Sequence, residues 1–128
     1  MPRPRVFVTR RIPEAGLSKI VSACDAEVWP EQLPPPYDLI RQKIADCDGL
    51  VSLLTDRIDG ELLDAAAKLK VVSNFAVGFN NIDVPACRAR GVVVTNTPDV
   101  LTNACADFTW GLILAITRRL GEGERVVR

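Results

Sequence analysis

The residues best suited to bind a small ligand lie in the segment from Val71 to Asp83. The segment opens with a short β-branched run, which predicts a buried strand. It breaks at Gly78 and resumes at Asp83, just ahead of Pro85. Aspartate as an N-cap with proline in the first turn is a strong signal for a helix start. A strand, a glycine-containing loop and a helix N-terminus can present unpaired main-chain N–H groups, so we expect an anion-binding loop here.

Other groups that commonly perform catalysis are missing or scattered. The 128 residues contain no histidine, which removes the usual general acid or base and the commonest metal ligand. The glycines of Gly121-Glu122-Gly123 lack the third glycine of a dinucleotide fingerprint and follow a helical pattern, so we reject that motif. No CxxC pair is present, so we interpret the cysteines as small buried residues in a reducing cytoplasm and expect no metal site. These cysteines are Cys24, Cys47, Cys87 and Cys105.

Composition and charge are those of an ordinary globular protein with one core. Lys+Arg and Asp+Glu are balanced at 16 each, which argues against nucleic acid or an anionic membrane as a partner. The start of the chain does not resemble a signal peptide, and the longest apolar run, 112–116, is too short to span a bilayer. We therefore expect a cytoplasmic protein.

Strand and helix patterns alternate along the first 95 residues. Strands are predicted at 5–9, 26–29, 49–54, 70–73 and 92–95, and helices from 13 or 14 and at 37–45, 60–67 and 84–90. This alternation predicts an α/β fold, a flavodoxin-like, doubly wound parallel sheet of five strands. Ligands of such sheets bind beyond the carboxyl ends of the strands. The Gly78 loop and the turns at 9–11 and 53–55 all lie at that edge.

Local signals within these elements give further expectations. Asp59 is a plausible N-cap, and Gly91 is a plausible left-handed terminator. The inner faces are assigned to Leu17, Ile20 and Val21 in the first helix, and to Leu62, Leu63, Ala66 and Ala67 in the third. Arg10 and Arg11 could hold an anion at the end of the first strand, although solvated loop charges are the favoured interpretation.

A long C-terminal linking helix is predicted from Asn103 or Ala104 to about Leu120. Apolar residues cover nearly its whole circumference, and a helix that is apolar all round must be buried all round. Five strands and their own helices cannot bury it on every side. We therefore expect this helix to lie against another domain or another subunit.

Four collinear segments resemble the N-terminal part of the D-isomer-specific 2-hydroxyacid dehydrogenases, and within them the glyoxylate/hydroxypyruvate reductases. The segments are VFVTRRIPE at 6–14, LLTDRID at 53–59, AVGFNNID at 76–83 and VTNTPDVLT at 94–102. The resemblance implies a two-domain enzyme that reduces a small 2-keto acid with NAD or NADP as cofactor. It implies a substrate-binding domain at 1–100, and at 101–128 an interdomain helix that packs in a homodimer and begins a nucleotide-binding domain.

The resemblance also implies roles for particular residues. Main-chain N–H groups of the loop at Ala76, Val77 and Gly78 would hold the substrate carboxylate, and Leu53 would line the same cleft. Thr102 matches a position near the nicotinamide, which is compatible with a simple role as helix N-cap.

The catalytic Arg, Glu and His of the family and its G-x-G-x-x-G motif match nothing in these 128 residues. We therefore expect an N-terminal portion of such a reductase, inactive alone and without a cofactor bound to it. One alternative is a non-catalytic flavodoxin-like interaction module that assembles through helix 104–120. A receiver-like signalling module is disfavoured, because Thr9-Arg10-Arg11 and Leu53-Leu54 stand where that fold needs acidic residues.

Overall fold

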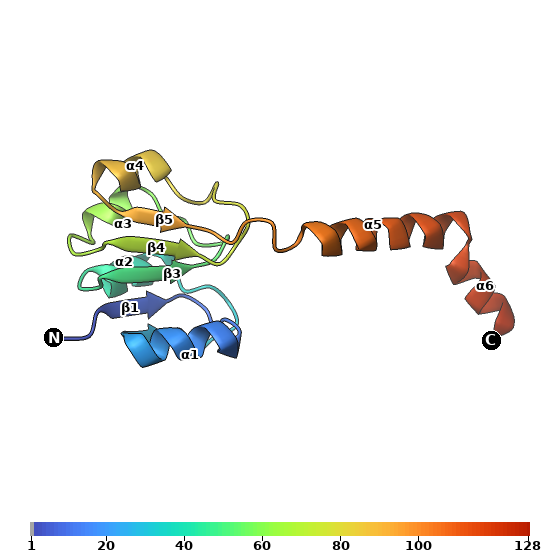
Figure 1. Ribbon diagram of the computed structural model, residues 1–128, viewed down its shortest axis with the longest axis horizontal. Helices are drawn as coiled ribbons and strands as arrows, with labels where there is room; N and C mark the ends of the chain where they lie inside the picture. The colour runs from blue at the N-terminus through green and yellow to red at the C-terminus, as the bar shows by residue number, and fades with distance from the viewer. Residues whose placement is uncertain (1) are drawn as a thin grey trace. The chain divides into compact units, whose positions relative to one another are not determined.

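Five parallel strands form a single sheet in the order β2-β1-β3-β4-β5 (Figure 1). The strands are β1 (Arg5–Val8), β2 (Asp25–Val28), β3 (Gly49–Ser52), β4 (Val71–Asn74) and β5 (Val93–Thr95). The computed structural model describes residues 2–128. It divides into two compact units, Met1–Thr97 and Pro98–Arg128, and the sheet belongs to the first. The predicted flavodoxin-like doubly wound order is confirmed.

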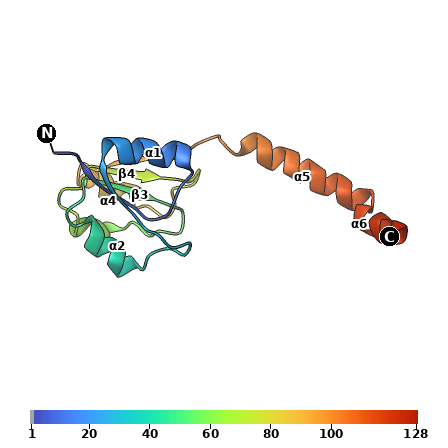
Figure 2. The same cartoon turned by 90° about the horizontal axis from the view of Figure 1, so that it is seen from below.

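Helices cover both faces of the sheet, as Figure 2 shows for the first two. They are α1 (Glu14–Ala23), α2 (Tyr37–Ile44), α3 (Gly60–Asp64) and α4 (Val84–Ala89). The main core lies on the face opposite α1. There Phe7, Leu50 and Val72 are in register on adjacent strands and pack with buried residues of the helices, including Ile40, Ile44, Leu62 and Leu63. Because the core anchors each strand, the loops beyond the strand ends start from fixed positions.

Two of the predicted inner positions are wrong. Val21 of α1 is 48% exposed, while Leu17 is buried. Ala67 is exposed, because α3 ends at Asp64 and the chain beyond it no longer follows a helical face. The strands also end within a few residues of the predicted limits. Leu53 and Leu54 fall outside β3, in the turn that follows it.

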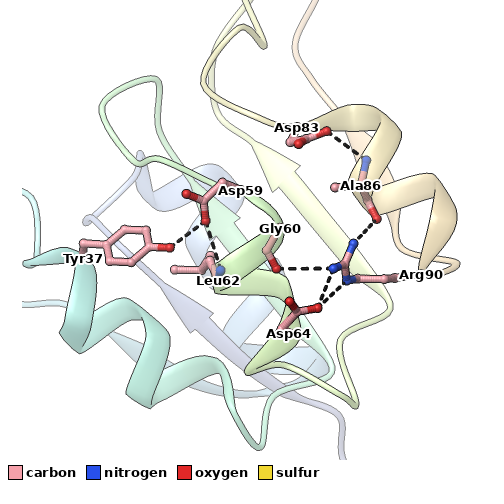
Figure 3. Close-up of polar contacts among 8 residues, drawn as sticks. All are labelled: Tyr37, Asp59, Gly60, Leu62, Asp64, Asp83, Ala86 and Arg90. Carbon is pink, nitrogen blue, oxygen red and sulfur yellow. Dashed lines mark hydrogen bonds and ion pairs between the residues drawn. The ribbon is translucent and has the colours of Figure 1, made fainter.

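The predicted helix caps are confirmed (Figure 3). The Asp59 carboxylate accepts the Leu62 N–H at 3.0 Å, and the Asp83 carboxylate accepts the Ala86 N–H at 2.9 Å. Gly91 has φ of 71°, the left-handed conformation that glycine adopts without the cost of a Cβ. These caps fix where α3 and α4 begin and where the chain turns into β5.

Arg90 links α3 and α4 on the outside of the sheet (Figure 3). Its guanidinium donates to the Asp64 carboxylate at 2.5 and 3.0 Å, and to the carbonyl oxygens of Ala86 at 3.1 Å and Gly60 at 3.5 Å. The side chain therefore joins the C-terminal end of one helix to both ends of its neighbour. We expect this side chain to fix the two helices relative to each other, because helices this short depend on tertiary contacts for their stability.

Tyr37 should titrate well above its ordinary pH range. Its hydroxyl donates to Asp59 at 2.6 Å (Figure 3), and burial, this hydrogen bond and the negative charges of Asp59 and Glu61 raise the pKa of Tyr37 to about 12. A raised folded-state pKa contributes stability that is complete below pH 10 and is lost as the pH rises toward 12. Because the chain has one tyrosine, the ultraviolet absorbance of tyrosinate reports this group alone.

An Asp59→Asn variant is the matched control for this titration. Asparagine keeps an oxygen that can accept both hydrogen bonds but removes the negative charge, so the titration midpoint should fall toward 10. A midpoint near 10 in the unmodified, folded chain would contradict the assigned environment of Tyr37.

The second unit contains two helices where one was predicted. They are α5 (Thr102–Thr117) and α6 (Leu120–Val127). The predicted helix over 104–120 is therefore wrong at its C-terminal end. The chain breaks at Arg119, which has φ of 53°, and Gly121 and Gly123 lie inside α6. The all-round apolar surface of α5 is present as predicted. No helix within residues 2–128 is long and apolar enough to cross a membrane.

The cysteines do not share one environment. Cys47 and Cys87 are buried, as predicted, and burial raises the pKa of both thiols. Cys24 is only half-buried, and Cys105 on α5 is exposed. The prediction that all four are buried is therefore wrong for Cys105.

Candidate functional site

The loops that follow β1, β3 and β4 meet at the carboxyl edge of the sheet. Parallel strands end at the same edge, so residues that are distant in sequence become neighbours there. The loop at 75–81 after β4 contains Ala76, Val77 and Gly78, the residues predicted to bind an anion. Its shape depends on the exit from β5 on one side and on the turn after β3 on the other.

The three carbonyl groups of the predicted binding loop all accept hydrogen bonds from the protein. The Ala76 carbonyl accepts the Thr97 N–H at 2.9 Å, and the Val77 carbonyl accepts Nδ2 of Asn96 at 2.7 Å. The Gly78 carbonyl accepts Nδ2 of Asn74 at 2.9 Å. The acceptor side of this loop is therefore turned toward the protein.

The three N–H groups of the same residues have no acceptor among residues 2–128. Ala76 is half-buried, whereas Val77 is 40% exposed and Gly78 is also exposed. Main-chain N–H groups without a protein acceptor carry a positive partial charge, which can attract a carboxylate or another small anion. The role of Ala76, Val77 and Gly78 in holding a carboxylate stays a prediction.

Two asparagine side chains connect this loop to the turn that contains Leu53. Nδ2 of Asn74 donates to Oδ1 of Asn81 at 3.2 Å, as well as to the Gly78 carbonyl. Nδ2 of Asn81 in turn donates to the Leu53 carbonyl at 3.1 Å and to the Asp56 carbonyl at 2.9 Å. The structure thus joins Leu53 to the Gly78 loop through a short chain of amide hydrogen bonds, which the sequence did not indicate.

Asp56 is a buried carboxylate beneath the same turn, with 2% of its surface exposed. Its Oδ2 accepts the Thr9 hydroxyl at 2.5 Å and the Leu53 N–H at 2.8 Å, and among the described residues Oδ1 has no hydrogen-bond partner. The carboxylate therefore ties the end of β1 to the turn after β3. A carboxylate in a loop sequence is usually a solvated charge, so the sequence did not indicate this buried role of Asp56.

The two arginines after β1 have different roles. Arg10 donates to the Gln32 carbonyl at 2.8 Å and to Oγ1 of Thr55 at 2.9 Å, so it holds surface loops together. Arg11 lies 3.8 Å from Glu14 with both side chains mostly exposed, which fits the favoured interpretation of a solvated charge.

Thr102 lies in the second unit, as the first residue of α5. The N-cap is Leu101, and the Thr102 side chain makes no capping hydrogen bond. The interpretation of Thr102 as a simple N-cap is therefore wrong.

At this edge of the sheet, the donors of Ala76, Val77 and Gly78 that lack an acceptor among the described residues are main-chain amides, which do not act as general acids or bases. Within residues 2–128, no group of three His, Cys, Asp or Glu side chains is placed to hold a metal ion.

Five parallel strands with helices on both faces define the chain as a flavodoxin-like α/β domain. The catalytic-domain model of the D-isomer specific 2-hydroxyacid dehydrogenases matches residues 6–120. The chain belongs to this family.

Known relatives agree with this assignment. A glyoxylate reductase from Korarchaeum cryptofilum is 52% identical over 126 residues, 98% of this chain and 38% of the relative. A solved structure from Thermus thermophilus matches with a TM-score of 0.86 and 39% identity, over 97% of this chain and 40% of that one. An NADPH-dependent glyoxylate/hydroxypyruvate reductase from Sinorhizobium meliloti, solved with NADP and malonate, matches with a TM-score of 0.73 and 34% identity. That match covers 98% of this chain and 38% of the other.

Proposed function

We propose that this chain is the substrate-binding portion of an NAD(P)-dependent reductase of glyoxylate/hydroxypyruvate-type 2-keto acids. The observation that carries the proposal is the loop of three free N–H groups at Ala76, Val77 and Gly78. The names of the relatives from Korarchaeum cryptofilum and Sinorhizobium meliloti support the choice of substrate. The chain spans about 38% of the length of those relatives, so the activity belongs to the whole enzyme.

In this proposal the loop holds the carboxylate of the keto acid. Charge-assisted hydrogen bonds from main-chain N–H groups are shorter and stronger than neutral ones, and three of them fix the carboxylate plane as well as its position. The side chains of Asn74 and Asn81 link the turn at Leu53 to this loop. In that position Leu53 would limit the size of the substrate. The domain itself would comprise residues 1–100, followed by an interdomain segment at 101–128.

The residues of this chain do not fit a dinucleotide. Gly121 and Gly123 lie within α6 rather than in a turn between a strand and a helix, so they form no phosphate-binding loop. We propose that NAD or NADP is held by other parts of the intact enzyme, where the nicotinamide supplies the hydride, and that Thr102 lies near it. This chain would bind and orient the keto acid only.

A second candidate is a non-catalytic module that assembles through α5. The observation in its favour is the run of exposed apolar residues on α5, among them Phe108 at 69% and Ile116 at 75% exposed. Within the first proposal the same surface forms a homodimer, so assembly alone does not separate the two candidates. Binding of a keto acid does.

The test uses the chain alone and a chimera. With ¹⁵N-labelled chain, oxamate (a non-reacting isostere of a small 2-keto acid) should shift the amide resonances of Ala76, Val77 and Gly78. The chain alone should not oxidise NADH or NADPH with glyoxylate. A chimera in which it replaces the matching 126 residues of the Korarchaeum cryptofilum reductase should do so.

Two results would count against the proposal. If oxamate leaves the amide resonances of these three residues unshifted, the assigned carboxylate site is wrong. Turnover by the 128-residue chain alone would show that it carries catalytic groups beyond those assigned here.

A further inference from the structure

The exit from β5 clamps the binding loop through two consecutive residues. Nδ2 of Asn96 donates to the Val77 carbonyl at 2.7 Å, and the main-chain N–H of Thr97 donates to the Ala76 carbonyl at 2.9 Å. Neither contact involves the strand ladder, since β5 ends at Thr95. The sequence 94–102 therefore does more than connect the sheet to α5.

Each of these contacts also fixes the direction of the N–H group in the same peptide unit. The unit is planar, and its C=O and the N–H of the next residue point in opposite directions. When Asn96 holds the Val77 carbonyl, the Gly78 N–H in the same plane must point away from Asn96. The Thr97 contact fixes the Val77 N–H in the same way through the Ala76 carbonyl.

We propose that Asn96 is a positioning residue for the carboxylate site, because its side chain fixes the Val77–Gly78 peptide so that the Gly78 N–H faces the ligand. This rests on the proposed function. Without the amide, rotation of that peptide would let the Val77 carbonyl turn outward, where its partial negative charge would oppose the carboxylate. Asn96 contacts the Val77 carbonyl, not the ligand, and takes no part in the chemistry.

Asn96 is better suited to a test than the other residue that holds the loop through its side chain. Asn74 is 1% exposed and also accepts the Ser52 hydroxyl at 2.9 Å, so replacing it would disturb the buried end of the sheet. Asn96 is half-buried, and among residues 2–128 its side chain makes one hydrogen bond, to the Val77 carbonyl. Its replacement should leave the fold intact.

The experiment compares Asn96→Ala and Asn96→Asp with the unmodified chain in the ¹⁵N titration with oxamate. Alanine removes the donor, and the dissociation constant should rise roughly 2- to 12-fold, as expected for one hydrogen bond. Aspartate has almost the same shape but presents oxygen to the Val77 carbonyl and adds a negative charge. The Asn96→Asp variant should therefore lose more affinity for oxamate than Asn96→Ala. Asn80→Ala is the matched control. Asn80 is an exposed amide of the same loop, with no side-chain hydrogen bond among the described residues, so its affinity should not change.

The chimera adds a readout that general destabilisation would not mimic. The KM for glyoxylate should rise in the Asn96→Ala chimera by the same factor as the oxamate dissociation constant, while the KM for NADPH stays unchanged. An unmodified chain whose loop amides do not respond to oxamate would defeat the proposed function. If the unmodified chain binds oxamate, two results would contradict the role of Asn96 while leaving the proposed function intact. In the first, Asn96→Ala binds oxamate as tightly as the unmodified chain; in the second, Asn80→Ala loses as much affinity as Asn96→Ala.

Discussion

Gly78→Pro should raise the KM for glyoxylate in the chimera by roughly 10- to 150-fold, the range for a hydrogen bond to a charged group. Proline has no main-chain N–H, so the variant removes one of the three donors in the loop. Its carbonyl can still accept from Asn74, as the Gly78 carbonyl does at 2.9 Å. The KM for NADPH should remain unchanged, since no contact of this loop is assigned to the cofactor.

Gly78→Ala is the matched control for that change. A Cβ built at Gly78 would lie 3.5 Å from Oδ1 of Asn80, an ordinary van der Waals contact, and Gly78 does not have the positive φ that favours glycine. Alanine keeps the N–H, so its KM should stay within about twofold of the unmodified chimera, consistent with the small effects of surface substitutions. Equal KM values for the proline and alanine variants would show that the Gly78 N–H does not bind the carboxylate.

Self-association of the chain should depend on the apolar surface of α5. The helix has no buried residue, and Trp110 and Ile113 are 65% and 44% exposed. They are three residues apart and so share one face. Because burial of each such side chain contributes about 1.5–3 kcal/mol, the paired change Trp110→Glu and Ile113→Glu should weaken dimerisation by at least about 100-fold.

Sedimentation velocity over a concentration series provides the measurement. The unmodified chain should form a dimer, and the double variant should remain a monomer. Asn103→Glu is the control, because it adds one glutamate charge at an exposed polar position of the same helix without removing apolar surface. An unmodified chain that stays monomeric throughout, or an Asn103→Glu variant that dissociates like the double variant, would contradict the assigned role of α5.

The order of the sheet and the helix starts could be predicted because their signals are local. Asp59 and Asp83 each precede a helical pattern by one position, and a carboxylate there has few better partners than the N–H groups of the first turn. Gly91 likewise marks a left-handed turn in the sequence. The alternation of such elements then leaves a parallel sheet as the compact solution.

The break between α5 and α6 had no local signal. Arg119 adopts φ of 53° although an arginine side chain disfavours that region, and the apolar pattern continues through Leu120. The three asparagines that shape the binding loop were missed for a different reason. Amide side chains are common in loops, and whether Asn74, Asn81 or Asn96 reaches a particular carbonyl depends on strands that are separated in sequence.

In the proposed function, main-chain N–H groups of the binding loop hold the carboxylate, so its binding does not depend on the identity of the side chains there. Any substitution at Ala76 or Val77 other than proline retains the N–H groups, and the carbonyls of these residues are held by Asn96 and Thr97, which follow β5. Mutational drift at these positions should therefore alter which substrate tail is accepted while leaving its carboxylate anchored. Under the proposed function, such a loop would be a tolerant starting point for the directed evolution of new keto acid specificities.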